Sequence, residues 1–236
     1  MLCDARQSLF ILGGGAIKTD ITELVRRSGA AFFTTFCGRG LIEGNHAKYM
    51  GSALARPGSP GTIAKADLVV VIGSELGEVD IWWCELGYKA PMVRVDVDPE
   101  ALSDHHHADL RILMRAEDFV PKLVKRLPDQ AQPCLWAYDA IANDRKLWRS
   151  QAEPEFPEVA KIFLALQDVM PKEATIHFDM TQFAYLAKEI WDMPRPGHWH
   201  HPFGFGTLGY ALPAAIGGSV PRPGLPILAI TGDCGF

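Results

Sequence analysis

The amino-acid sequence predicts an α/β protein in which a doubly wound parallel sheet is followed by a second, incomplete α/β unit. Short apolar runs recur along the chain and end in glycine or polar residues, which is typical of strands buried on both faces of a parallel sheet. Amphipathic segments alternate with these runs. A polar, proline-bounded stretch at residues 128–133 (PDQAQP) then separates two such series.

Composition narrows the class of protein further. The 236 residues are 48% hydrophobic, so the chain can bury a core, and its length allows one large domain or two small ones. The net charge of -5 argues against a nucleic-acid surface. No apolar run is long enough for a membrane span or a signal peptide. The five scattered cysteines, without a CxxC pair, suit a reducing cytosol, so we expect a cytoplasmic location.

The first unit opens with a strand at Ser8–Leu12 that runs into three glycines, Gly13–Gly15. Thr19 or Asp20 can cap the helix that follows, which ends at Gly29. This order of strand, glycines and helix can place a phosphate on a helix N-terminus, although a structural turn explains it equally well. The remaining expected elements are a strand at 30–36, a helix at 61–66, strands at 67–73, 92–98 and 110–114, and a helix at 117–127.

The second unit begins after two helices, expected at 135–149 and 157–170. A strand at Thr175–Phe178 presents the polar residues 179–182 at its end, and a helix at 183–191 follows. An apolar helix that contains Pro213 in its first turn then leads to a buried strand at Leu225–Thr231 and the turn 232–235 (GDCG). In open α/β sheets, ligands bind at the carboxyl ends of strands. Asp233 is therefore the candidate ligand of a divalent cation that bridges a diphosphate.

The segment GTLGYALPAAIGG (206–218), followed by a strand and GDCGF (232–236), resembles the cofactor-binding domain of thiamine-diphosphate enzymes, specifically the acetolactate synthase-like 2-oxo acid decarboxylases and carboligases. Weaker matches at 13–15, 34–51, 66–78 and 95–100 are similar to the central domain of that family. The resemblance implies a central domain at 1–130, a linker with helices at 131–165, and the N-terminal part of the cofactor domain at 166–236. DMTQ, FGTLGYALPAAIG and GDCGF together are similar to decarboxylases of the 5-guanidino-2-oxopentanoate type.

The resemblance also implies the site residues. Asp233 matches the magnesium ligand, and Leu208 matches the bulky apolar residue that holds the cofactor bent. The residues that match positions near the cofactor are Met180, Thr181 and Gln182 at its diphosphate end, Gly206, Thr207 and Leu208 beside its rings, and Gly232, Cys234 and Gly235 with Asp233 in the diphosphate cradle. Cys234 has no base nearby and is read as a small residue that the cradle tolerates rather than as a nucleophile.

The implied cofactors are thiamine diphosphate and Mg2+, and the implied reaction cleaves or forms a C–C bond of a small 2-oxo acid through a cofactor carbanion. The family's catalytic glutamate belongs to a separate N-terminal domain, so no catalytic residue is assigned here. The asparagine pair that closes the metal site lies downstream of the last residue. We therefore expect a fragment of a longer homodimeric or homotetrameric enzyme, inactive alone. The resemblance leaves the particular 2-oxo acid open.

Tight FAD binding is not expected. Acetolactate synthases carry arginines in the stretch corresponding to 73–80, whereas this chain has Glu75, Glu78 and Asp80, whose charges would face a pyrophosphate. Asp96 and Asp98 match positions that elsewhere in the family lie near a bound nucleotide. The alternative function is therefore a non-catalytic nucleotide-binding or partner-binding module. Binding of a mononucleotide at Gly13–Gly15 would support this alternative.

Other motifs carry weaker expectations. The GxGxxG pattern at 204–209 is interpreted as coincidental, because no strand is expected at 198–202 and no ribose-binding acid follows. The histidines at 105–107 are expected in a solvated loop. Those at 198, 200 and 201 precede the cofactor loop, and whether they line the active-site mouth stays open. Trp82, Trp83 and Trp191 are interpreted as core or interface residues.

Overall fold

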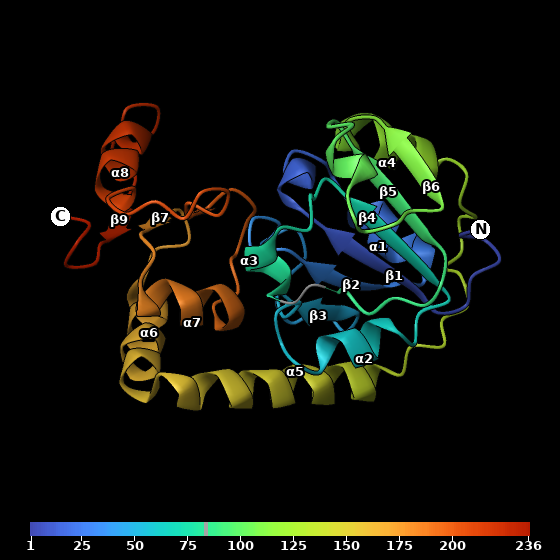
Figure 1. Cartoon of the computed structure of the whole chain (residues 1–236), viewed down its shortest axis with the longest axis horizontal. Helices are drawn as coiled ribbons and strands as arrows, with labels where there is room; N and C mark the ends of the chain where they lie inside the picture. The colour runs from blue at the N-terminus through green and yellow to red at the C-terminus, as the bar shows by residue number, and fades with distance from the viewer. Residues whose placement is uncertain (83–84) are drawn as a thin grey trace.

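The computed structural model, which describes residues 1–82 and 85–236, contains two α/β units (Figure 1). A six-stranded parallel sheet forms the first unit and a three-stranded parallel sheet the second, so the predicted fold class is confirmed. In Figure 1 the first unit lies on the right and the second on the left, with a long helix running below both. Trp83 and Cys84 lie outside the described residues.

The first sheet has the strand order β3-β2-β1-β4-β5-β6. Its chain runs outward from β1 to β3 and then returns to β4 on the other side of β1, which creates a topological switch point between β1 and β4. Ligand crevices form at such points, beyond the carboxyl ends of the strands. The strands are β1 (Ser8–Leu12), β2 (Ala31–Thr34), β3 (Tyr49–Gly51), β4 (Leu68–Ile72), β5 (Met92–Asp96) and β6 (Leu110–Leu113).

Local sequence explains most helices of this unit. Asp20 Oδ1 accepts a hydrogen bond from the Thr22 N–H at 2.9 Å at the start of α1, and Gly29 ends α1 in the left-handed conformation, at φ 65°. The helix expected at 61–66 is displaced, because α2 begins at Ser59, directly before Pro60. The helical segments are η1 (Gly14–Ala16), α1 (Thr22–Ser28), α2 (Ser59–Ile63), α3 (Glu78–Ile81), η2 (Ala101–Ser103) and α4 (Ala116–Val124).

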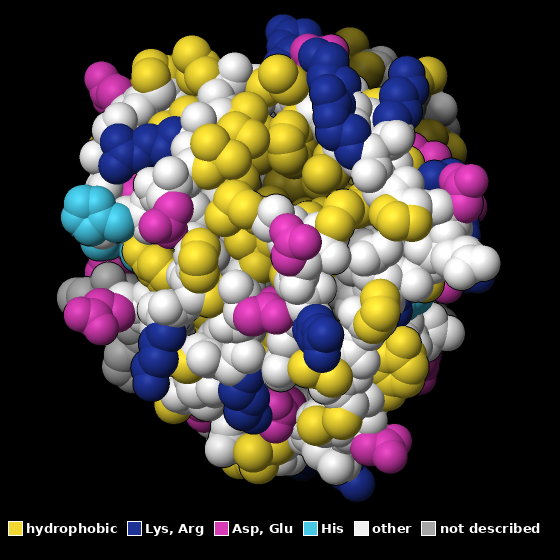
Figure 2. All heavy atoms as spheres, turned by 90° about the vertical axis from the view of Figure 1, so that its right-hand side faces the viewer, with side chains coloured by type: hydrophobic (Ala, Val, Ile, Leu, Met, Phe, Trp, Pro, Cys, Tyr) yellow, Lys and Arg dark blue, Asp and Glu magenta, His cyan; other side chains and the backbone are white. Residues whose placement is uncertain are grey.

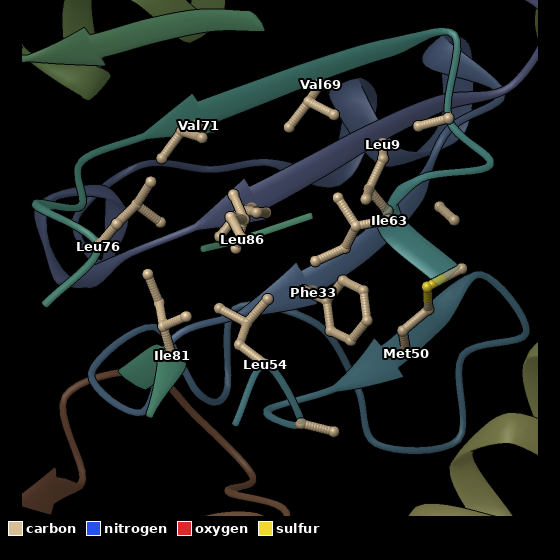
Figure 3. Close-up of a cluster of buried hydrophobic side chains, with 14 of the residues drawn as sticks. Leu9, Phe33, Met50, Leu54, Ile63, Val69, Val71, Leu76, Ile81 and Leu86 are labelled. Atoms are coloured by element: carbon tan, nitrogen blue, oxygen red, sulfur yellow. The ribbon is translucent and has the colours of Figure 1, made fainter. Parts of the chain in front are cut away.

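Apolar clusters cover both faces of the first sheet. Leu9, Ile11 and Val69 point to one face, where they meet residues of the loops and of α2 (Figure 3). Phe10 and Val70 point to the other face, toward α1 and α4. Because successive strand residues alternate between faces, a strand covered on both sides must be apolar at every position. The continuous runs in the sequence therefore reflect this sandwiching by helices.

The second sheet has β7 at its centre, between β8 and β9. The expectation of no strand at 198–202 was wrong, because Trp199 and His200 pair in parallel with Ile176 and His177. A two-residue strand is too short to produce a periodic pattern. The elements after the first sheet are α5 (Tyr138–Ala152), η3 (Glu153–Glu155), α6 (Pro157–Val169), β7 (Thr175–Phe178), α7 (Gln182–Ile190), β8 (Trp199–His200), α8 (Ala211–Ser219) and β9 (Ile227–Ile230).

Helix α5 is the long helix that runs below both units (Figure 1). Its residues Ile141 and Trp148 belong to the core of the first unit, whereas Ala152 belongs to the core of the second. Before α5, the buried Trp136 donates a hydrogen bond from Nε1 to the Ser8 carbonyl oxygen at 2.8 Å. The chain after the first sheet is thus attached to β1 before it crosses to the second unit.

Several apolar residues are more exposed than the sequence suggested. The strand β9 was expected to be buried on both faces, but its four residues are half-buried, and Ile216 of α8 is 61% exposed. Trp82 is 57% exposed, so it is not a core residue, whereas Trp191 is buried. The exposure in β9 and α8 arises because the second sheet has three strands and α8 packs on just part of it.

The side of the first unit turned away from the second carries a mixed surface (Figure 2). Hydrophobic side chains gather in the upper middle of this view, and acidic and basic side chains are interspersed around them. The edge strand β6 contributes exposed apolar residues to the first unit, Leu110 and Leu113. Among the described residues, no helix has both the length and the apolar character needed to cross a bilayer.

Candidate cofactor-binding site

Asp179, at the carboxyl end of β7, joins the three segments of the candidate site. Its side chain is buried, and Oδ1 accepts a hydrogen bond from the Ala211 N–H, at the start of α8, at 2.7 Å. Its Oδ2 lies so close to Gly235 that a Cβ on that glycine would come within 2.0 Å of it. The end of β7, the loop before α8 and the turn after β9 therefore meet at one carboxylate.

Pairs of residues predicted for the site also come together. A Cβ on Gly206 would lie 3.7 Å from Met180 Cε, and one on Gly232 would lie 3.3 Å from Thr181 Cγ2. Gly206 takes a left-handed conformation, φ 66°, which a larger residue adopts only with strain. The loop and the glycine turn thus approach residues 180–181 at positions where a larger side chain would intrude.

The remaining predicted residues differ in their surroundings. Asp233 and Cys234 are exposed, and Leu208 is 57% exposed. Thr181 caps α7, because its Oγ1 accepts a hydrogen bond from the Ala184 N–H at 3.2 Å. Gln182 is the first residue of α7, and Thr207 Oγ1 donates to the Leu208 carbonyl oxygen at 3.2 Å. Asp233 is therefore the accessible carboxylate of the turn. The side chain of Thr181 instead stabilises the start of α7.

These residues are suited to bind a magnesium diphosphate group, but they supply only some of the ligands that the metal needs. Mg2+ prefers oxygen ligands and retains several from water or phosphate, so one exposed carboxylate is an adequate protein contribution. Buried Asp179 Oδ2 has no hydrogen-bond partner among the described residues. Within the described chain, no three His, Cys, Asp or Glu residues are grouped to hold a metal ion by themselves. A metal at Asp233 would thus depend on oxygens from the ligand.

Sequence reasoning noted Asp179 only as the residue at the end of its strand. The signal that could have identified its role was present, since an acid directly after a buried parallel strand needs partners. The partners themselves, Ala211 and Gly235, lie 32 and 56 residues further along the chain. Their position depends on how α8 and β9 pack on β7, which no local pattern reveals.

Fold and site together define a thiamine pyrophosphate enzyme. Residues 1–123 match the central domain of thiamine pyrophosphate enzymes, and residues 179–236 match the C-terminal TPP binding domain. The first match alone covers more than half of the 236 residues, and the chain belongs to the thiamine pyrophosphate enzyme family. Membership in this family implies thiamine diphosphate as the cofactor.

Curated relatives include decarboxylases and synthases. The chain is 32% identical to the probable 2-ketoarginine decarboxylase AruI of Pseudomonas aeruginosa, over 100% of this chain and 42% of that protein. It is 25% identical to an acetolactate synthase of Mycobacterium leprae and 26% identical to the acetolactate synthase large subunit IlvB1 of Mycobacterium tuberculosis, over 99% of this chain and 40% of each relative. The chain thus spans about two fifths of the length of these relatives.

Cavities open beyond the carboxyl ends of the first sheet, beside Gly14 and Gly15. One, of about 330 Å³, is lined by the basic residues Lys18 and Arg115 together with Asp96 and Glu117. Its neighbour, of about 280 Å³, is lined by four acids: Glu75, Asp80, Asp96 and Asp98. Glu75 and Asp80, two of the three acids expected to oppose a flavin pyrophosphate, thus line the second cavity, whereas the cations Lys18 and Arg115 line the first.

Four of the eight histidines are buried, namely His106, His177, His198 and His201. His106 was expected in a solvated loop but is 4% exposed, because Asp104 accepts its N–H at 2.8 Å and also binds Arg94 at 2.5 Å, which folds the loop inward. In the second unit, His200 stacks on His177 with 4.5 Å between ring centroids. His198 and His201 are buried as well.

Because His201 is buried, we expect the protein to lose stability in mild acid. Burial, reinforced by the nearby Lys188 and Arg39, lowers the pKa of His201 from 6.5 to about 3. The unfolded chain therefore binds a proton first, so stability that is complete above pH 6.5 declines as the pH falls toward 3. At pH 5 the loss from His201 is about 2 kcal/mol.

Urea unfolding at pH 7 and pH 5 measures this dependence. His201→Phe is expected to reduce the difference between the two pH values by about 2 kcal/mol. The exposed His105 provides the matched control, because His105→Phe should leave the difference unchanged. An unchanged difference in His201→Phe would contradict the assignment.

Proposed function

We propose that this chain provides part of the cofactor site of a thiamine-diphosphate- and Mg-dependent 2-oxo acid decarboxylase or carboligase. The convergence of residues 179–182, the loop before α8 and the turn 232–235 at Asp179 carries the proposal. The finer proposal is decarboxylation of 5-guanidino-2-oxopentanoate, supported by the 32% identity with the probable 2-ketoarginine decarboxylase. We further propose a cytoplasmic location and a homodimer or homotetramer for the longer enzyme.

Each part of the site has a proposed task. Asp233 ligates Mg2+, and the backbone N–H groups of the turn 232–235 bind diphosphate oxygens. Asp179 positions the turn against the start of α8, and the apolar Leu208 supports the rings. Bound thiamine diphosphate supplies the electron sink for C–C bond cleavage or formation at the 2-oxo carbon. The protein's share is to bind, orient and shield the reacting groups.

Isothermal titration of thiamine diphosphate, with and without Mg2+, tests the proposal. The titration uses this chain alone and this chain mixed with polypeptides that cover the remaining parts of the longer relatives. Mg-dependent binding in the reassembled protein is expected, and Asp233→Ala should weaken it at least ~100-fold, the upper end of the effect of residues that only support a metal ligand. Asp168→Ala, which removes an exposed carboxylate on α6, is the matched control.

A second candidate is the nucleotide-binding module, favoured by the cavity of about 330 Å³ beside Gly14, Gly15 and Lys18. An AMP titration distinguishes the two. AMP binding that is lost in Lys18→Ala, in a protein that gives no thiamine diphosphate response after reassembly, would replace the proposed function with this one. Mg-dependent thiamine diphosphate binding that Asp233→Ala abolishes would support the first.

A further inference from the structure

Lys188 of α7 lies in a pocket between the two units, which we call the Lys188 pocket. This pocket has a volume of about 440 Å³, and Arg56, Trp82, Glu155, Tyr185, Lys188 and Glu189 are among its lining residues. Arg56 is paired with both Glu155 and Glu189. Lys188 is only 3% exposed and, among the described residues, has neither a hydrogen bond nor an ion pair within 4.0 Å. It is thus a buried amine without a carboxylate partner.

Aromatic rings surround the Lys188 Nζ instead. The nitrogen lies 4.4 Å from the ring centroid of Phe36, 5.2 Å from that of Trp82 and 5.4 Å from that of Tyr185. Such rings attract an ammonium group, but they accept no strong hydrogen bond from it. The amine therefore lies among aromatic rings and beside the open volume of the pocket.

The charged groups that act on Lys188 belong to several segments of the chain. Asp80 in α3 and Glu189 in α7 favour the ammonium form, whereas Arg39 and Arg56 disfavour it. Burial outweighs all of them and lowers the pKa of Lys188 from 10.5 to about 8. Burial also raises the pKa of Asp80 to about 6, so Asp80 is ionised at neutral pH. A substantial fraction of Lys188 is therefore a neutral amine near pH 8.

We infer that Lys188 is a nucleophilic amine that captures small aldehydes entering the Lys188 pocket. The nitrogen lone pair attacks the carbonyl carbon, a C–N bond forms, and a proton moves from nitrogen to oxygen to give a carbinolamine. The C–O bond then breaks, water leaves, and a C=N bond remains. One aldehyde and one amine thus give one imine and one water, and the reaction needs no cofactor. Desolvated lysines in apolar pockets form imines in this way.

The charges of the pocket favour neutral aldehydes over anionic carbonyl compounds. With Lys188 in its neutral form, the charged side chains that line the pocket, among the described residues, are the cation Arg56 and the two carboxylates Glu155 and Glu189. This balance leaves one net negative charge, which repels a carboxylate. The apolar and aromatic walls suit an alkyl group instead.

Reductive labelling of the whole chain tests the inference. Propionaldehyde and sodium cyanoborohydride, a hydride donor, convert an imine into a stable propyl amine, and peptide mass spectrometry locates it. At pH 7, Lys188 is expected to be labelled at least ~10-fold faster than the exposed Lys18 and Lys161, because a lower pKa gives a larger neutral fraction.

Three variants make the test decisive. Lys188→Arg keeps a cation in the pocket but should abolish this label, and Lys161→Arg should leave it unchanged. Asp80→Asn, which retains an oxygen for the Phe36 N–H at 2.8 Å, removes a charge that favours the ammonium and should accelerate labelling at pH 7. Labelling of Lys18 and Lys161 ahead of Lys188 would overturn the inference. The comparison is made among lysines only, so the N-terminal amine is left out of it.

Discussion

Replacement of Arg56 by methionine is expected to lower the free energy of unfolding by about 3–5 kcal/mol, the usual cost of removing one partner of a buried ion pair. Arg56 comes from the first unit and binds two acids of the second, Glu155 at 2.7 Å and Glu189 through Nε. The Glu189 side chain is only 8% exposed, so it would remain as a buried charge without its guanidinium. The units would also lose their main ionic connection on this side.

Urea denaturation followed by circular dichroism measures the loss. The matched control is Arg149→Met, whose ion pair with Glu153 at 3.1 Å has both side chains about 40% exposed and should contribute less than ~1 kcal/mol. The double variant with Arg56→Met and Glu189→Met should be more stable than Arg56→Met alone, because it removes the unpaired buried charge. Equal losses of unfolding free energy in Arg56→Met and Arg149→Met would show that the buried pair stabilises the protein no more than the exposed pair does.

Gly13→Ala is expected to destabilise the first unit by about 3 kcal/mol, the upper range for overpacking. A Cβ on Gly13 would lie 2.1 Å from the Gly73 carbonyl oxygen and 2.5 Å from Ser74 Cβ. The same region holds β1 and β4 together, because the Gly13 N–H donates to the Ile72 carbonyl oxygen at 2.9 Å and the Gly15 N–H donates to that of Gly73 at 2.9 Å. The clash is with backbone, so the two loops must separate.

A second glycine provides the comparison. Gly61 lies inside α2, and an added Cβ there would meet no atom within 4 Å. Gly61→Ala should therefore stabilise the protein by roughly 0.5–1 kcal/mol, since alanine is the better helix former. Thermal unfolding of both variants beside the parent chain gives the result. A Gly13→Ala protein as stable as the parent would mean that the loops adapt to the extra methyl group.

Long apolar strands were the most predictable parts of the fold. β1 and β7 occur at the residues predicted. In β1, the unbroken apolar run at residues 9–12 marks a strand that is covered on both faces. β3, β8 and α3 were not predicted. They have two to four residues each, and their conformation depends on neighbours such as β2 and β7, with which β3 and β8 pair.

The residues of the candidate site could be predicted from sequence motifs, but the contacts between them could not. The turn 232–235 and the loop at 206–208 were identified from their residues, and Gly206, Gly232 and Gly235 lie close to residues 180, 181 and 179, respectively. The role of Asp179 at their junction was not foreseen, because its contacts with Ala211 and Gly235 depend on three-dimensional packing. The burial of Lys188 could not be predicted from the sequence either, because an isolated lysine in an amphipathic helix is ordinarily solvated.

The position of β1 inside the first sheet has a consequence for synthesis on the ribosome. β1 is made before its partner β4, which starts at Leu68, and before the edge strand β6, which ends at Leu113. At ~5–20 residues per second, the nascent chain must keep an apolar β1 unpaired on one side for several seconds. Trp136, which donates to the Ser8 carbonyl oxygen, is followed by Trp148 of α5, the last residue in the apolar core of that unit. The first unit can therefore be complete before β7 emerges, and a chaperone that binds nascent chains would be needed mainly during this first interval.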